Sequence, residues 1–275
     1  GTTDDMESIK AIKKVVSLGC NFIDTADVYG HGHSEELLGL ALSNVRKNVF
    51  IATKVGGSYI YNGEWGNMNF SEDYIKFALE KSLLRLRTNY VDVYQLHNPT
   101  LQMISEGEVF QSLQGLKKEG KIRAVGCSVH TLDEGLAALD FVDSVQCVFN
   151  LIDPRNYELL ETAKRRNIAV IAREPLANGM LTGKVAKDRK FEHGDIRHGM
   201  SSEYIGNITG IVDQFQNNLA HRKETMAQLA LKFVLHFDSV SVVIPGCKNE
   251  QQVAENMSAS DIPDLTEEDM DSLGS

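Results

Sequence analysis

Residues 20–30 of this 275-residue chain read CNFIDTADVYG, and this stretch decides the fold that the sequence predicts. It begins as a short apolar strand, stops at Asp24 and continues through a polar turn to Tyr29. Two later apolar runs also stop at an ionisable side chain, because IATK ends at Lys54 and VYQLH ends at His97. The carboxyl ends of the strands of an α/β barrel meet at one mouth, where such folds carry out chemistry. We therefore predict that these four side chains converge.

Each of the four residues also has an ordinary structural explanation. An aspartate at the end of a strand is usually a cap or a turn former, and a lysine there is usually solvated. Four such residues on successive strand ends of one barrel are harder to explain in this way. The pattern therefore favours a reaction site.

Short apolar runs alternate with amphipathic segments along the rest of the chain. The runs are apolar on both faces, as in a parallel sheet that is covered on both sides. This alternation predicts either a (β/α)8 barrel or a doubly wound sheet. Strands are expected at residues 21–23, 48–53, 90–96, 121–128, 144–150, 168–174 and 240–245. Helices are expected at residues 4–18, 35–42, 71–86, 106–119, 157–166, 211–237 and 250–258. A further helix is expected to begin at residue 131.

Local signals add predictions for caps and loops. Ser34 is expected to cap the second helix. The loop at residues 56–69 is rich in aromatic side chains, which either line a substrate pocket or pack locally. A polar, glycine-rich loop is expected at 175–207, with a break near His221 in the helix that follows. The aromatic residues of the first loop are Tyr59, Tyr61 and Trp65.

The composition narrows the class of protein. The formal net charge of −10 argues against non-specific binding to nucleic acid. No apolar run approaches the ~20 residues that cross a bilayer, so no membrane partner is expected. The four cysteines form no CxxC pair, which indicates reduced thiols and a cytoplasmic protein.

No metal site and no dinucleotide-binding glycine motif are predicted. His31 and His33 alternate in a loop without nearby cysteines or clustered carboxylates, which is typical of surface histidines. The nearest approach to a glycine fingerprint is GHGHSE, which lacks the third glycine and follows a loop instead of a strand.

A phosphate site is predicted at the end of the barrel. The loops after the last two strands of such barrels commonly bind phosphate through backbone N–H groups and the start of a helix. Here these loops are PLANGMLTGK and PGCKNEQQVAEN, and together they indicate a bound nucleotide. Their glycines and cations are Gly179, Gly183, Lys184, Gly246 and Lys248.

The segments FIDTADVYG, ATK and QLH resemble the catalytic tetrad of the aldo-keto reductase superfamily, and the resemblance extends from about residue 4 to residue 256. It implies a single (β/α)8 TIM-barrel domain over residues 1–275. Members begin with a hairpin and a first strand, which this sequence does not contain. We therefore expect the N-terminal hairpin and the first barrel strand to lie upstream of residue 1.

The resemblance also implies a site for NADP(H), with NAD(H) as a possible substitute. Ser128 and Gln146 match positions that hold the nicotinamide carboxamide, and Arg173 stands where many members stack a ring on the nicotinamide. Members often have Ser-Asn where this chain has Ser128-Val129, and some have arginine at the position of Gln252. The implied cofactor-binding residues are Ser128, Gln146, Arg173, Glu174, Pro175, Leu176, Asn178 and Gly179 with Lys184, followed by Gly246, Lys248 near the 2′-phosphate, and Gln252, Glu255 and Asn256 near the adenine.

The implied reaction is reduction of an aldehyde or a ketone, a small carbonyl substrate. Tyr29 would give a proton to the carbonyl oxygen, although a free tyrosine is a weak acid at neutral pH. The ammonium group of Lys54 would stabilise the tyrosinate, Asp24 would hold Lys54 charged, and His97 would orient the substrate oxygen.

Two other functions fit the same sequence. Some members of the superfamily turn over slowly and serve as regulatory subunits of membrane channels. A barrel lyase or isomerase could instead place a substrate phosphate in the late loops. The sequence specifies neither the physiological substrate nor the oligomeric state.

Overall fold

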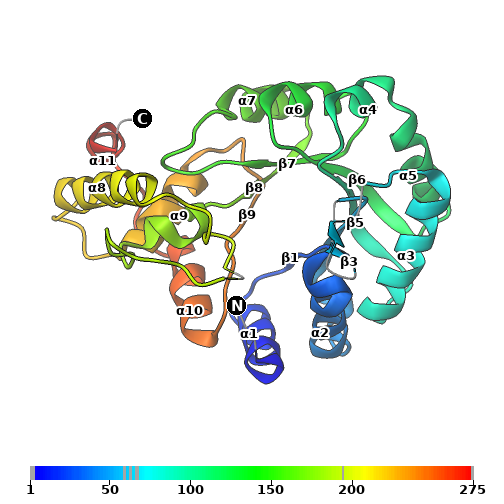
Figure 1. The fold of residues 1–275 in the computed structure, drawn as a ribbon, viewed down its shortest axis with the longest axis horizontal. Helices are drawn as coiled ribbons and strands as arrows, with labels where there is room; N and C mark the ends of the chain where they lie inside the picture. The colour runs from blue at the N-terminus through cyan, green and yellow to red at the C-terminus, as the bar shows by residue number, and fades with distance from the viewer. Residues whose placement is uncertain (1–3, 58–59, 62–63, 66–67, 194, 274–275) are drawn as a thin grey trace.

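The computed structural model describes residues 4–57, 60–61, 64–65, 68–193 and 195–273. Its main sheet has seven parallel strands in the order β1-β2-β5-β6-β7-β8-β9, with helices around the outside (Figure 1). The strands form a nearly closed barrel, and the predicted barrel fold is confirmed. The bounds are β1 Phe22–Asp24, β2 Phe50–Val55, β5 Val91–His97, β6 Ile122–Ser128, β7 Ser144–Val148, β8 Ala169–Arg173 and β9 Val242–Ile244.

The helices follow the strands in alternation, as the sequence predicts. Asp4 caps the first helix, Ser71 caps the third, and Thr131 forms a capping box with Glu134 at the sixth. The helices are α1 Asp5–Ser17, α2 His33–Leu42, α3 Glu72–Leu86, α4 Leu101–Glu106, α5 Glu108–Lys118, α6 Leu132–Ala138, α7 Tyr157–Arg165, α8 Ser202–Asn218, α9 Met226–His236, α10 Glu250–Met257 and α11 Glu267–Ser272. Short 3-10 turns lie at Tyr29–Gly32, Arg46–Asn48, Ala177–Thr182 and Ser258–Ser260.

The hydrophobic core lies between the strands and the surrounding helices. Ile51 of β2, Leu79 of α3 and Leu96 of β5 are fully buried there. The strands β1 and β9 are the two edges of the sheet, and all their residues are only partly buried. An edge strand has a neighbour on one side only, which leaves half of its ladder groups without a strand partner.

The beginning of α2 differs from the prediction. The helix begins at His33 after Gly32, and Ser34 instead accepts a hydrogen bond from the Thr25 hydroxyl at 2.9 Å. Gly32 has a φ of 93°, in the left-handed region, and an added Cβ would lie 2.6 Å from the Arg85 side chain. Tertiary packing at this glycine therefore fixes the start of the helix.

The loop predicted at residues 56–69 contains regular structure. It includes a two-stranded antiparallel hairpin, β3 Ile60–Tyr61 and β4 Glu64–Trp65. Strands of this length are too short to show an alternation of apolar and polar residues in the sequence. Tyr59 and the side chains of Tyr61 and Trp65 lie outside the described residues, so their predicted place in a pocket stays a prediction.

The helical region after residue 200 was also predicted incorrectly. The expected loop ends early because Ser201 caps α8, which begins nine residues before the predicted start at 211. A new helix, α9, begins after Thr225, which forms a capping box with Gln228. The break near His221 is confirmed.

The predicted helix at 106–119 is present as α5, which begins two residues later than expected, at Glu108. Gly107, with a φ of 74°, separates α5 from the additional helix α4. Across the described parts of the chain, no helix has both the length and the apolar character needed to cross a membrane.

The strand register brings the predicted site residues together. Lys54 lies opposite Gln95, and His97 lies opposite Ser128. Ser128 in turn lies opposite Gln146 on the next strand. Since parallel partners in register point to the same side of a sheet, the barrel aligns these polar side chains at one end.

Candidate active site

Lys54 is the centre of the site. Its side chain is 1% exposed, and its Nζ donates to the Asp24 Oδ2 at 2.5 Å and to the Thr25 carbonyl at 2.9 Å. A third contact, at 3.5 Å, reaches the hydroxyl of Tyr29. A buried ammonium group of this kind requires an ionic partner, which Asp24 supplies.

Asp24 is fixed by two amides from neighbouring strands. Its Oδ1 accepts from the Gln95 Nε2 at 3.0 Å and from the Gln146 Nε2 at 2.9 Å. The two amides also contact each other, with the Gln146 Nε2 3.3 Å from the Gln95 Oε1. Both carboxylate oxygens of Asp24 are therefore satisfied, which holds the ion pair to Lys54 in one geometry.

Tyr29 lies at the mouth of the barrel and is 43% exposed. Its ring centroid is 5.0 Å from the Lys54 Nζ and 6.0 Å from the imidazole of His97, which meets it edge-on. The four predicted residues thus lie together, with the rings of Tyr29 and His97 in edge-on contact.

His97 is held in its neutral form. Burial lowers its pKa to about 3, and the charges of Lys54 and Arg173 act in the same direction. Its Nδ1 is buried and makes no hydrogen bond within the described structure. A buried ring nitrogen without a partner is typical of a functional site, where a ligand completes the bonding.

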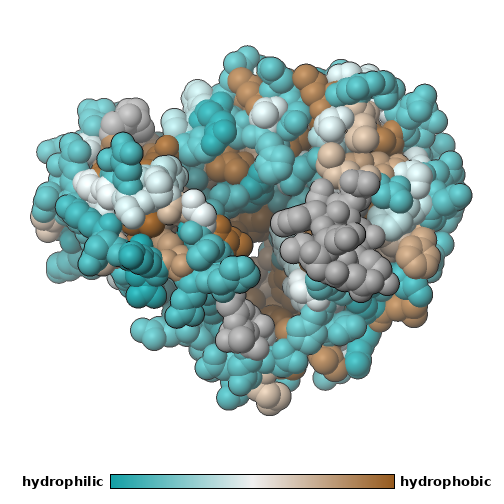
Figure 2. All heavy atoms as spheres, in the orientation of Figure 1, coloured by the Kyte–Doolittle hydropathy of each residue, from teal (hydrophilic) through white to brown (hydrophobic). Residues whose placement is uncertain are grey.

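A cavity of about 390 Å³ lies beside His97. Its walls include Asn98, Thr100 and His130, whose pKa is lowered by burial and by the nearby Arg173. Gly57 also lines it, and a Cβ there would lie 2.7 Å from the His97 Nδ1. Figure 2 shows the face of the molecule seen in Figure 1, which is hollowed at its centre.

The first predicted cofactor loop has an unusual backbone. Glu174, Ala177 and Asn178 have φ values of 53°, 46° and 55°, all in the left-handed region that non-glycine residues rarely adopt. Such strain accumulates at functional sites, where the surrounding structure maintains it. The carboxylate of Glu174 holds this geometry by binding Arg173 at 2.5 Å and the Asn178 amide at 3.1 Å.

The second predicted cofactor loop surrounds an open glycine. A Cβ on Gly246 would meet nothing within 4 Å, so a ligand can approach its backbone. The backbone amide of Lys248 donates to the Gln252 Oε1 at 2.8 Å, and the side-chain amide of Asn256 donates to the Cys247 sulfur at 3.1 Å. These contacts shape the start of α10, where a helix N-terminus favours an anion.

Two predicted residues join the loops to each other. The Lys184 Nζ and the Glu255 Oε2 form an ion pair at 2.8 Å. Pro175 and Leu176 are buried at the base of the first loop. The open glycine of the second loop and the strained backbone of the first are together consistent with a dinucleotide lying across this side of the mouth.

The predicted carboxamide ligands have protein partners of their own. The hydroxyl of Ser128 donates to the Asn98 Oδ1 at 3.3 Å, and Gln146 is bound to Asp24. Both side chains are almost fully buried. Holding a carboxamide would require them to share or exchange these bonds.

Several site residues were not singled out from the sequence. Gln95 precedes His97 by two positions on a strand, and this spacing could have placed it on the same face. Asn98 and His130 gave no signal of their own.

Arg197 gave no signal either, because it belongs to a long irregular loop. It donates to the Asn178 carbonyl at 3.2 Å. The same guanidinium holds the pKa of Asp195 well below its usual range. A segment that is distant in sequence therefore supports the first predicted cofactor loop.

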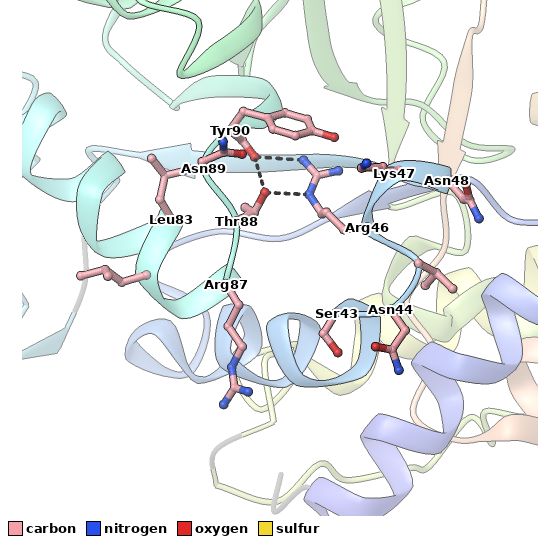
Figure 3. A pocket seen from close by; sticks show the side chains of 12 residues that line it. Ser43, Asn44, Arg46, Lys47, Asn48, Leu83, Arg87, Thr88, Asn89 and Tyr90 are labelled. Atoms are coloured by element: carbon pink, nitrogen blue, oxygen red, sulfur yellow. Dashed lines mark hydrogen bonds between the residues drawn. The ribbon is translucent and has the colours of Figure 1, made fainter.

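A larger cavity, of about 870 Å³, lies at the opposite end of the barrel. It is formed by loops at residues 43–48 and 87–90, which precede β2 and β5 (Figure 3). Its Arg46 is already bonded to the Val49 and Tyr90 carbonyls and to Asp92 at 2.8–3.0 Å. This cation stabilises the loops and lies far from the reacting groups.

Comparisons with known proteins agree with this arrangement. The family model described as Aldo/keto reductase family matches residues 1–275. An uncharacterized oxidoreductase of Bacillus subtilis is 32% identical over 279 residues, covering 99% of this chain and 88% of the relative. A relative of Escherichia coli named NADH-specific methylglyoxal reductase is 29% identical over 279 residues, covering 95% of this chain and 85% of that protein.

A solved structure shows the same fold. The aldo/keto reductase from Klebsiella pneumoniae in complex with NADP and acetate is 26% identical, with a TM-score of 0.74. The match covers 98% of this chain and 84% of that one. The chain belongs to the aldo/keto reductase family.

Proposed function

We propose that this protein reduces an aldehyde or a ketone to an alcohol with a nicotinamide cofactor. The observation that carries the proposal is the position of Lys54, whose buried ammonium group touches both Asp24 and the Tyr29 hydroxyl. The cofactor supplies a hydride when bound. The residues of this chain supply the proton and hold the substrate.

Tyr29 is the proton donor in this proposal. Its hydroxyl lies 3.5 Å from the Lys54 ammonium group, which can stabilise the negative charge that forms on the tyrosine oxygen as the proton leaves. Asp24 forms the ion pair with Lys54, and the amides of Gln95 and Gln146 keep Asp24 in place. The proton passes from the Tyr29 hydroxyl to the oxygen of the substrate carbonyl, and this tyrosine faces the solvent from which it regains one.

His97 orients the substrate. Its low pKa, about 3, means that it is a neutral imidazole at physiological pH and can donate one hydrogen bond to the carbonyl oxygen. It contributes direction and polarity without releasing a proton of its own.

NADP(H) is the preferred cofactor in this proposal, with NAD(H) as the alternative. Lys248, at the start of α10, is an exposed cation suited to the extra phosphate of NADP(H). Lys248 lies close enough to the carboxylate of Asp195 to lower the pKa of that carboxyl group, so an acidic side chain already shares the charge of Lys248. The occurrence of both cofactors in the names of relatives makes a direct comparison necessary.

The test follows the loss of absorbance of NADPH and of NADH with a panel of aldehydes, ketones and sugars. We expect turnover with at least one small carbonyl compound and faster turnover with NADPH. Tight cofactor binding without turnover across the whole panel would support a regulatory subunit instead. Absence of binding by either cofactor would contradict the proposal altogether.

A further inference from the structure

Asp27 occupies the turn that carries the proposed proton donor. It lies between Asp24 and Tyr29, and its amide donates to the Lys54 carbonyl at 3.4 Å. Two more backbone hydrogen bonds stabilise the turn. The Thr25 amide donates to the Ala52 carbonyl, and the Tyr29 amide donates to the Ala26 carbonyl. Asp27 and Tyr29 therefore belong to one hydrogen-bonded turn, which the amides of Thr25 and Asp27 join to β2.

The carboxyl group of Asp27 is poorly placed to carry a charge. Its Oδ1 is buried and has no hydrogen-bond partner in the described part of the chain. Glu35 of α2, which is fully buried, adds a second carboxylate to the same region. An unpaired buried oxygen beside another negative charge strongly favours the protonated acid.

The nearby cations do not compensate this charge fully. Arg85 of α3 is 2.7 Å from Glu35, and Lys54 of β2 is paired with Asp24, so each cation is shared with another carboxylate. Both cations and the Val28 backbone amide lower the pKa of Asp27, but burial raises it by more. Tyr94 of β5, a further titratable neighbour, is buried and donates its hydroxyl to the Ile75 carbonyl. Burial, followed by the repulsion of Glu35, raises the pKa of Asp27 to about 7.

We propose that Asp27 is a positioning residue for Tyr29 and works in its protonated form. The neutral carboxyl group keeps the turn at residues 25–29 closed against Lys54. On ionisation Asp27 is repelled by Glu35, the turn loosens, and the Tyr29 hydroxyl leaves the ammonium group. This inference rests on the proposed function, because it requires Tyr29 to be the proton donor.

The experiment measures the single-turnover rate of carbonyl reduction at saturating cofactor between pH 5.5 and 9. We expect the parent rate to fall about tenfold from pH 6 to pH 8, as for one ionisation near pH 7. Asp27→Asn, which cannot ionise, should keep its pH 6 rate up to pH 8. Glu36→Gln, which removes an exposed carboxylate from the same helix as Glu35, should behave like the parent.

Two results would overturn the inference. One is an unchanged fall between pH 6 and pH 8 in a folded Asp27→Asn variant. The other, which does not depend on the variant folding, is an Asp27 carboxyl that titrates near pH 4 in the ¹³C NMR spectrum of the parent protein. Full activity of Tyr29→Phe would instead refute the proposed function, so the two failures are distinguishable.

Discussion

The two sides of the barrel mouth are built in different ways. On the side of β1, β2 and β5, buried side chains at strand ends make the site, and the Lys54–Asp24 pair is almost inaccessible to solvent. On the side of β8 and β9, loops form the mouth, with left-handed backbone at Glu174 and an ion pair whose lysine, Lys184, is 63% exposed. The geometry of the first side is set by the interactions of its buried side chains, and the geometry of the second is set mainly by the conformation of its backbone.

The largest expected effect tests the buried side. Lys54→Met leaves the Asp24 carboxylate without a cation, which should lower the free energy of unfolding by about 3–5 kcal/mol. Carbonyl reduction should fall by at least ~10²-fold, because Tyr29 loses its electrostatic partner. Urea unfolding and single-turnover kinetics measure the two effects.

Lys184→Met is the matched control from the loop side. The Lys184 side chain is 63% exposed in its ion pair with Glu255, so solvent screens the pair and the unfolding free energy should change by less than about 1 kcal/mol. Equal destabilisation by the two substitutions would show that the buried and exposed pairs do not differ as we describe.

A smaller effect concerns the neutral imidazole of His97. Its pKa in the folded protein, about 3, lies below the unfolded value near 6.5. The contribution to stability is therefore present above pH 6.5 and is lost as the pH falls from about 6.5 toward 3. We expect the parent to lose roughly 2–3 kcal/mol more than His97→Asn between pH 7 and pH 4.5 in urea unfolding. Parallel losses in the two proteins would contradict a neutral buried His97.

The cofactor side can be probed at Lys248. Lys248→Ala should weaken NADPH binding by about 1–3 kcal/mol and leave NADH binding nearly unchanged, since only NADPH carries the 2′-phosphate. Lys187→Ala is the control, because this exposed lysine is paired with Asp213. Titration calorimetry with both cofactors measures the difference, and equal weakening of NADH would remove Lys248 from the phosphate site.

The smallest effect tests the strained backbone. Ala177 has a φ of 46°, which glycine adopts more easily, so Ala177→Gly should leave stability unchanged or raise it by up to about 1 kcal/mol. Ala186→Gly, at a loop position without a positive φ, should instead be destabilising by roughly 0.4–1 kcal/mol, because glycine gives the unfolded chain more conformational freedom. Thermal unfolding compares them, and the same loss in both variants would argue against strain at Ala177.

The same contrast explains what the sequence could predict. The strand ends at Asp24, Lys54 and His97 are readable because a short apolar run stops at a polar residue. The strand register then brings them together, as expected for a parallel barrel. Gln95 was missed although its spacing on the strand allowed it to be found.

Features that depend on tertiary packing could not be predicted from the sequence. The start of α2 is decided by Gly32 against Arg85, which is distant in sequence. The left-handed conformation of Ala177 has no signal in its residue type, and Arg197 reaches Asn178 from a loop with no periodic pattern. The hairpin β3–β4 is too short to produce an alternation.

The most direct test of the account is the rate of carbonyl reduction by Tyr29→Phe, measured in single turnover with cofactor binding determined on the same sample. Phenylalanine keeps the ring and removes only the hydroxyl that lies 3.5 Å from the Lys54 Nζ. We predict a loss of at least ~10²–10⁴-fold in the rate, with the dissociation constant of the cofactor nearly unchanged. A folded Tyr29→Phe protein that reduces the substrate within a few-fold of the parent rate would contradict Tyr29 as the proton donor.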